Sequence, residues 1–194
     1  MKSIIKNRIQ ESILTKQKLF DDEKLLEKIN ALTNVSACSL KEKHKLILCG
    51  NGGSASDALH FAGEIVGRFQ MERNPWPAVV LNSDVATMTA ISNDYGYDDV
   101  FARQAKAHCQ LGDIFIGIST SGNSENVYRA VQVAKEQGCV TAALLGRDGG
   151  KIKDIVDYPI IIPSDVTARV QECHIMIIHI ICELVELGMS ESDE

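Results

Sequence analysis

The sequence has no surplus of positive charge, and this absence excludes one large class of functions. Its 194 residues include 20 Lys and Arg against 26 Asp and Glu, which gives a net charge of −6 at pH 7. Broad nucleic-acid surfaces need a basic face, so we do not expect one here. The overall field would also repel an anionic ligand, so local dipoles and a few cations must hold any that binds.

Paired cysteines, long apolar runs and a leader-like segment are missing as well. The six cysteines are scattered without a CxxC spacing, and several lie in apolar runs, which is typical of reduced core residues in the cytosol. The N-terminus soon becomes charged and lacks a signal-peptide core. The most apolar stretch, Ile175 to Leu187, is interrupted by His179 and Glu183 and is shorter than the ~20 residues that span a bilayer. These features predict a cytoplasmic protein.

Repeats, low-complexity tracts and Pro-rich linkers are absent too, so we expect a single domain over residues 1–194. Residues 3–38 have helical periodicity, and the pair Asp21-Asp22 predicts a break between two N-terminal helices. These helices, within residues 1–40, are too apolar to stand alone. We expect them to pack on the domain or on a neighbouring subunit.

From residue 45, short apolar runs alternate with longer amphipathic segments. The runs predict strands at Lys45–Cys49, Ala78–Leu81, Ile114–Ile118, Val140–Leu145 and Tyr158–Ile162. Helices are predicted near 54–69, 84–92, 98–109, 124–137 and 165–188, with a short one around 150–155. Continuous Val, Ile and Leu runs between helices are typical of a parallel sheet covered on both faces. The sequence therefore predicts a doubly wound α/β domain of about five parallel strands, with ligands beyond the carboxyl ends of the strands.

The loop 119–126, with the sequence STSGNSEN, follows an apolar run and opens a predicted helix. Its hydroxyls and amides, together with the first free N–H groups of the helix, suit a phosphate or a similar anion. Helix capping alone would also favour Ser and Asn, but one capping residue would suffice for that. We therefore predict that this loop binds a phosphorylated small molecule.

A second polar loop, GNGGSAS at 50–56, follows the first predicted strand. Its glycines allow positive φ and let backbone N–H groups approach a ligand closely. It has neither the GK[ST] of a P-loop nor a GxGxxG fingerprint, and a tight turn is the simple alternative. Two such loops at the same edge of one sheet favour a binding site.

The helix predicted after this loop carries His60, Glu64 and Arg68 at successive spacings of four residues, which places them in one stripe. A solvated helix face with an ion pair is the simple interpretation. Because the stripe begins close to the loops, His60 and Glu64 could instead be metal ligands or acid/base groups. Arg68 could bind substrate or neutralise Glu64.

Two further polar clusters stay undecided. Asn93 and Asp94, in the segment NDYGYD (93–98) between predicted helices, could end a helix or hydrogen-bond sugar hydroxyls. The last predicted helix carries several polar side chains in an apolar surface: Arg169, Gln171, Glu172, His174 and His179. Spacing does not favour His179 over His174, or Gln171 over Glu172, and a His in an apolar stripe is more often a core residue than a ligand.

Five segments together resemble the phosphoheptose isomerases of the sugar isomerase (SIS) fold, and they cover nearly the whole chain. The segments are GNGGSASDALHFAGEIVGRF (50–69), SNDYGYDDVFARQ (92–104), GDIFIGISTSGNSENV (112–127), LGRDGGKI (145–152) and ARVQECHIMIIHIICELVE (168–186). The resemblance implies a flavodoxin-like five-stranded sheet with an N-terminal helical hairpin and a long C-terminal helix. It also implies conversion of sedoheptulose 7-phosphate to D-glycero-D-manno-heptose 7-phosphate, the entry step to ADP-heptose for lipopolysaccharide or a related glycan.

The same resemblance implies a homotetramer with active sites at subunit interfaces and, in many members, a zinc ion. The phosphate-binding residues it implies are Ser119, Thr120, Ser121 and Ser124. Residues implied to bind the sugar are Asn51, Gly52, Gly53, Glu64, Asn93, Asp94 and Gln171. The implied zinc ligands are His60, Glu64, Gln171 and His179. In an aldose–ketose isomerisation, Glu64 would be the base at carbon, and His179 the acid/base for ring opening or for proton transfer to oxygen.

One position departs from the family pattern, because many members have Asp where this chain has Ala168. A non-catalytic relative of the same fold, which associates with a replication initiator, also has Ala there and is the alternative from another functional class. That binder lacks the carboxylate at 64, the serine at 121 and the histidine at 179. Since this chain has Glu64, Ser121 and His179, we favour the enzyme. An isomerase of a different sugar phosphate is the third interpretation.

Overall fold

The computed structural model of the chain describes residues 1–190. Residues 191–194, the last part of the domain expected over 1–194, lie outside the described range. Within this range the elements follow in the order α1 (Lys2–Phe20), α2 (Glu23–Lys41), β1 (Leu46–Gly50), α3 (Gly53–Val66), β2 (Ala78–Val80), α4 (Val85–Tyr95), η1 (Tyr97–Asp99), α5 (Val100–His108), β3 (Ile114–Ser119), α6 (Glu125–Glu136), β4 (Val140–Gly146), η2 (Ile152–Asp154), β5 (Tyr158–Ile162) and α7 (Thr167–Ser190).

The strands form one parallel sheet in the order β2-β1-β3-β4-β5. All five predicted strands are present, and their ends differ from the predictions by no more than one residue. The central strands β1 and β3 are buried along their whole length, as expected for continuous aliphatic runs in a doubly covered sheet. The predicted doubly wound α/β fold is therefore confirmed.

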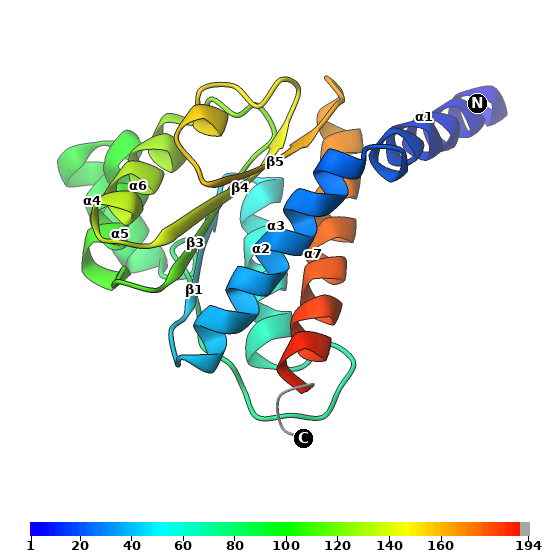
Figure 1. Cartoon of the computed structure of the whole chain (residues 1–194). Coiled ribbons are helices and arrows are strands. Elements are labelled where there is room, and N and C mark those ends of the chain that lie inside the picture. Colours follow the sequence, from blue (N-terminus) through cyan, green and yellow to red (C-terminus); the bar gives the residue numbers. More distant parts are fainter. Residues whose placement is uncertain (191–194) are drawn as a thin grey trace.

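Helices cover both faces of the sheet (Figure 1). Alternate strand residues enter two separate cores. Leu48 and Ile116 pack with α2, α3 and α7 on one face. Ile47 and Phe115, one residue earlier in each strand, pack with α4, α5 and α6 on the other. The six cysteines of the described range are all free and five of them are buried, as the sequence predicted.

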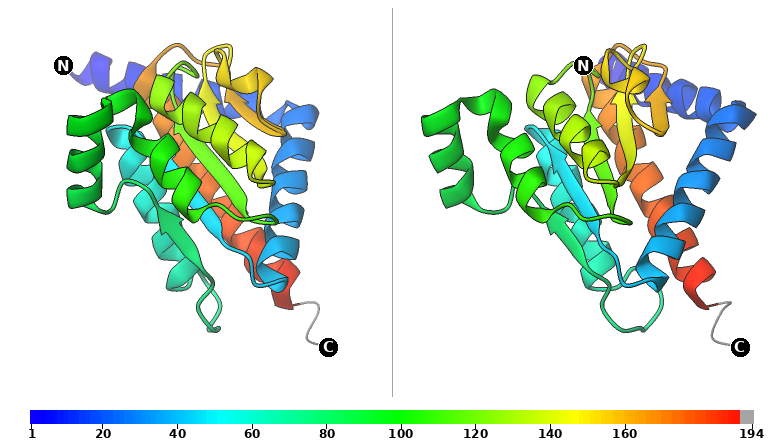
Figure 2. Two further views of the ribbon diagram at one scale, coloured as in Figure 1. Left: turned by 90° about the vertical axis from the view of Figure 1, so that its left-hand side faces the viewer. Right: turned by 60° about the vertical axis from the view of Figure 1, so that its left-hand side comes forward.

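The two N-terminal helices break where Asp21-Asp22 predicted. Asp22 caps α2, because its carboxylate accepts a hydrogen bond from the backbone N–H of Leu25 at 3.1 Å. The first turns of α1 extend away from the rest of the chain, as Figure 1 and Figure 2 show. Ile4, Ile9 and Ile13 are 58%, 56% and 53% exposed there, so this helix carries an apolar stripe that the single chain does not bury.

The last helix, α7, is long and apolar enough to cross a membrane by length and composition alone. It packs against α2 and α3, and its side chains Val170, Ile177, Ile181 and Val185 are fully buried in the core. These contacts are those of a core helix.

The predicted end of the helix at 54–69 is wrong. The observed α3 ends at Val66 with Gly67 as its C-cap, so Arg68 lies beyond the helix and pairs with Glu72 at 3.5 Å. A helical stripe of His60, Glu64 and Arg68 is therefore not formed, and only the first two share a helix face.

The predicted helix at 84–92 is too short. The observed α4 continues to Tyr95 and ends at Gly96, whose φ of +91° favours glycine. Asn93 and Asp94 consequently lie in the last turn of a helix and not in a connection between helices.

Candidate active site

The two polar loops meet at the carboxyl edge of the sheet. Strands β1 and β3 are neighbours, with Gly50 in register with Ile118, so the loops that follow them leave side by side. Asn51 and Asn126 join the loops through two amide hydrogen bonds of 2.9 and 3.0 Å. The hydroxyl of Tyr97 also donates to Asn51 Oδ1 at 2.8 Å. The predicted meeting of the two loops is therefore confirmed.

Three serine hydroxyl groups cluster at the start of α6, and Thr120 lies next to them in the chain. Ser119 Oγ lies 2.8 Å from Ser124 Oγ and 3.5 Å from Ser121 Oγ, with Thr120 half-buried between them in sequence. Ser124 is the N-cap of α6, so the first N–H groups of this helix point toward the cluster. We call Ser119, Thr120, Ser121 and Ser124 the hydroxyl cluster. Hydroxyls and a helix N-terminus together suit an anion such as a phosphate.

A carboxylate next to this cluster is neutralised by its neighbours. Glu125 begins α6 and forms ion pairs with Lys151 and with Arg129, the latter at 2.8 Å. Hydrogen bonds from Lys151 and then from Arg129 lower the pKa of Glu125. Arg129 and Lys151 therefore balance the negative charge of Glu125, so that it does not oppose a bound anion.

The loop after β4 supports the turn of the hydroxyl cluster from behind. The backbone N–H of Ile152 donates to the carbonyl of Gly122 at 3.0 Å. Gly122 has φ of +67°, and a Cβ there would lie 2.1 Å from the carbonyl oxygen of Gly149. Only glycine fits this contact, which fixes the turn that presents Ser121.

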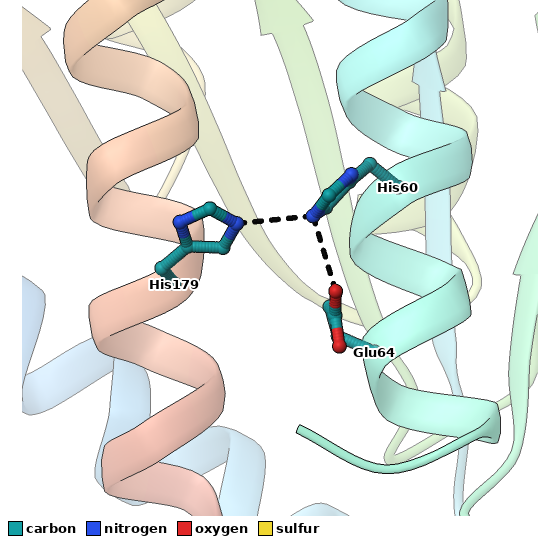
Figure 3. A group of neighbouring side chains, drawn as sticks. All are labelled: His60, Glu64 and His179. Carbon is teal, nitrogen blue, oxygen red and sulfur yellow. Dashed lines mark hydrogen bonds and ion pairs between the residues drawn. The ribbon is translucent and has the colours of Figure 1, made fainter. Parts of the chain in front are cut away.

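A second cluster lies between α3 and α7 and combines two imidazoles with a carboxylate. His60 Nε2 is 3.1 Å from Glu64 Oε1 and 3.0 Å from His179 Nε2. Figure 3 shows His60 and Glu64 projecting from one face of α3 toward His179 on α7. His60 and Glu64 are 44% and 25% exposed, so the cluster is open to ligands.

The donor set of this cluster fits a zinc ion. One ligand atom from each of His60, Glu64 and His179 lies within 4.8 Å of the others. His60 Nε2 carries at most one proton, so it cannot donate fully to both the Glu64 oxygen and the His179 nitrogen. A cation between the three atoms would satisfy all of them. Two imidazole nitrogens and a carboxylate oxygen are also a common ligand set for zinc.

The fourth implied ligand, Gln171, lies on α7 against the start of α3, away from these three side chains. Its side chain contacts the backbone of Gly53, where a Cβ would lie 2.3 Å from Gln171 Nε2. The preceding Gly52 has φ of +57°. Asn51, Gly52, Gly53 and Gln171 are thus neighbours at the start of α3. Asn93 and Asp94 hydrogen-bond to each other at 2.9 Å on the exposed end of α4.

The structure distinguishes the pairs on α7 that spacing left open. His174 is fully buried, and its Nε2 lies 3.1 Å from the carbonyl oxygen of Leu145. Burial lowers the pKa of His174 to about 4, so it is a neutral core residue. Glu172 pairs with Arg169, which in turn bonds to α1. His179 and Gln171 are therefore the residues that face α3.

Sequence reasoning missed several residues around these clusters. Tyr97 and Asn126 lie within quoted segments, but their contacts with Asn51 depend on the fold. Asp57 precedes His60 by one turn of α3 and is half-buried, and burial raises its pKa. Its Oδ2 has no hydrogen-bond partner among the residues that the structure describes. The spacing of three residues between Asp57 and His60, which places both on one helix face, could have indicated Asp57 from the sequence.

Comparisons with known proteins agree on one family. The sequence matches the SIS domain over residues 13–146. A phosphoheptose isomerase from Geobacter metallireducens is 54% identical over 168 residues, which cover 87% of this chain and 89% of that protein. One from a Nitratiruptor species is 51% identical over 180 residues, covering 92% and 96%. The structure of a phosphoheptose isomerase from Neisseria gonorrhoeae superposes with a TM-score of 0.90 at 40% identity, covering 96% of this chain and 98% of that one.

Proposed function

Because the chain belongs to the phosphoheptose isomerase family of SIS-domain proteins, we propose that it interconverts sedoheptulose 7-phosphate and D-glycero-D-manno-heptose 7-phosphate. It is an aldose–ketose isomerase, and its product would enter ADP-heptose synthesis. The observation that carries the substrate class is the hydroxyl cluster at the carboxyl edge of the sheet, which suits a phosphate. This anion-binding cluster opens α6 on one face of the sheet, and an acid/base cluster lies in the second half of α3 on the other face.

In this proposal the substrate phosphate binds the hydroxyl cluster of Ser119, Thr120, Ser121 and Ser124, with the N-terminus of α6 behind it. The sugar extends from there toward the start of α3, where Asn51, Gly52, Gly53 and Gln171 offer amide and backbone groups. Asn93 and Asp94 complete the sugar-binding set.

The reaction moves a proton between C1 and C2 of the open-chain sugar through an enediol. Glu64 is the proposed base at carbon: its carboxylate has two oxygens, so one can face His60 while the other takes the proton. His179 is the proposed acid/base for ring opening or for the proton on oxygen. Each positioned acid/base group typically contributes ~10²–10⁴ in rate.

His60, Glu64 and His179 would hold a zinc ion in this site, and Gln171, the fourth ligand that the resemblance implies, would have to leave its contact with Gly53 to join them. When bound, zinc supplies a Lewis acid that favours negative charge on substrate oxygen. The convergence of three ligand atoms within 4.8 Å supports this part of the proposal.

We also propose that the protein acts as a cytoplasmic homotetramer with its active sites at subunit interfaces. The exposed isoleucine stripe of α1 supports an association between copies. A mostly apolar groove of about 470 Å³ lies between α1, α2 and α7, and it is lined by side chains including Phe20, Leu26, Met176 and Ile180. Large exposed apolar surfaces of this kind mark interaction sites.

A second sugar phosphate is the alternative substrate that a specific residue favours. Ala168 lies exposed in the first turn of α7, three residues before Gln171, where it offers no polar group to a sugar hydroxyl. The non-catalytic binder has no such support, because Glu64, Ser121 and His179 are all present and two of them share one cluster.

The proposal is tested by incubating the purified protein with sedoheptulose 7-phosphate beside fructose 6-phosphate and ribulose 5-phosphate. Formation of the aldose should be faster by at least one order of magnitude with the seven-carbon substrate. A faster reaction with a shorter ketose phosphate would assign the enzyme to that substrate instead. Absence of turnover with all three would contradict the proposal.

A further inference from the structure

The segment between α3 and β2, residues 67–77, is bonded to α7 through the buried carboxylate of Glu186. Glu186 is 3% exposed. Its Oε1 accepts hydrogen bonds from the N–H of Phe69 and from Arg73 Nε, both at 2.9 Å. Its Oε2 accepts from the N–H groups of Gln70 at 2.8 Å and Met71 at 2.9 Å. Burial opposes the charge, yet these backbone and guanidinium donors lower the pKa of Glu186, so the carboxylate stays ionised.

The same Arg73 ties this segment to the last turn of α3. Its Nη2 donates to the carbonyl of Glu64 at 2.8 Å, and its Nη1 donates to the carbonyl of Ile65 at 3.0 Å. These are carbonyls at a helix C-terminus, which lack partners within the helix. The guanidinium also stacks on Trp76, 3.5 Å from the ring centroid. Arg73 therefore fixes the backbone of the residue that supplies the proposed base.

The other end of the segment reaches the imidazole of His179. The Phe69 ring stacks on it, with centroids 5.6 Å apart and an interplanar angle of 23°. His179 and Glu186 are seven residues apart on α7, about two turns, so they share one side of the helix. By bonding to the backbone N–H of Phe69, the Glu186 carboxylate also keeps the Phe69 ring stacked on His179. The Nε2 atom of this imidazole is directed at His60.

We propose that Glu186, Arg73 and Phe69 are positioning residues for the acid/base cluster. Glu186 holds the segment, Arg73 fixes the turn of α3 that carries Glu64, and Phe69 restricts the rotation of the His179 ring. The inference deepens the proposed function and rests on it for the roles of Glu64 and His179. The restraint on the His179 ring can be tested whatever the substrate is.

Four variants separate positioning from a purely structural role. Phe69→Leu removes the ring but keeps an apolar side chain, and Phe69→Tyr keeps the ring. Glu186→Gln keeps the shape but loses the charge that four donors require. Met189→Leu is the matched control, an apolar exchange one turn after Glu186 on the same helix. For each we would measure kcat, KM, zinc affinity by competition with a chelator, thermal midpoint and a crystal structure.

Residues that orient ligands and catalytic groups typically change activity or metal affinity by ~10–100-fold. Phe69→Leu should lower kcat and zinc affinity about tenfold with KM within about twofold, and its crystal structure should show His179 in more than one rotamer. The thermal midpoint should stay within a few degrees of wild type. Phe69→Tyr, which keeps the ring, should retain a kcat close to that of wild type. Glu186→Gln should lower both kcat and the thermal midpoint. Met189→Leu should behave as wild type.

Unchanged kcat and zinc affinity in Phe69→Leu, with a single His179 rotamer, would overturn the inference. The inference would also be overturned if the fall in kcat of Glu186→Gln were fully explained by the fraction of unfolded protein. If the wild type turned over no sugar phosphate, the proposed function would fail, but the rotamer and zinc measurements would still decide the positioning role.

Discussion

Replacing Glu64 with glutamine tests the proposed base with little disturbance of the structure. Glutamine has nearly the same shape as glutamate and can keep one oxygen 3.1 Å from His60 Nε2. The side chain is 25% exposed, so water can solvate the new amide. We expect the free energy of unfolding to change by about 1 kcal/mol or less, as for most substitutions away from the core.

The effect on catalysis should be much larger. An amide cannot accept the proton from carbon, so the contribution of a positioned base, ~10²–10⁴ in rate, is lost. This loss corresponds to about 3–5 kcal/mol in the activation free energy. The affinity for sedoheptulose 7-phosphate should change by less than threefold, because the phosphate and most hydroxyls bind elsewhere.

The assay measures aldose formation in steady state and substrate affinity by calorimetry, with zinc content determined for each preparation. Glu72→Gln is the matched control, since Glu72 is 90% exposed and pairs with Arg68 outside the cluster. It should retain wild-type kcat and KM. A Glu64→Gln enzyme with full zinc content and kcat within threefold of wild type would refute the assignment of Glu64 as the base.

Three further results are expected. Ser121→Ala should raise KM for the phosphorylated substrate roughly tenfold, because it removes one hydrogen bond to a charged group, and kcat should stay nearly unchanged. An unchanged KM would count against the hydroxyl cluster as the phosphate site. Removal of zinc by a chelator should abolish turnover and zinc addition should restore it, whereas activity indifferent to both steps would leave His60 without a metal role. Because burial holds the pKa of His174 at about 4, below its ordinary 6.5, the neutral ring contributes stability above pH 6.5 that is lost as the pH falls toward 4. Between pH 7 and pH 5 this amounts to about 2 kcal/mol, so urea unfolding of His174→Gln should depend less on pH than that of wild type, and an equal dependence would contradict the account.

The sheet could be predicted from the sequence because its signals are local. Apolar runs such as those at β1 and β3 bury every residue, and a polar or glycine residue ends each run at the carboxyl edge. The positions of the two binding loops followed from this, since the carboxyl ends of parallel strands share one edge. The Asp22 cap was equally readable from its residue type.

Helix ends and helix faces were less predictable. Gly67 ends α3 one residue before Arg68, and periodicity alone does not show which glycine will end a helix. The choice between His174 and His179 depends on which side of α7 packs on the sheet, and both sides are apolar enough to do so. Motif resemblance favoured His179, and the core position of His174 agrees with it.

Contacts between distant segments could not be predicted at all. Glu186 bonds to Phe69 and Arg73, which lie 117 and 113 residues earlier in the chain. Neither residue type nor spacing indicates such a pair, because a buried carboxylate is recognised only by the donors that the fold collects around it. The same holds for Tyr97 and Asn51, 46 residues apart.

The central claim is that this enzyme isomerises a sugar phosphate by proton transfer through an enediol. The most direct test is to let wild-type enzyme bring sedoheptulose 7-phosphate to equilibrium in D₂O and to follow the C1 and C2 hydrogens by NMR. The account predicts aldose product with deuterium at C2, and exchange at C1 of the remaining ketose after many turnovers. Product formed at the full rate with no deuterium at either carbon would indicate a direct hydride shift and would contradict the account.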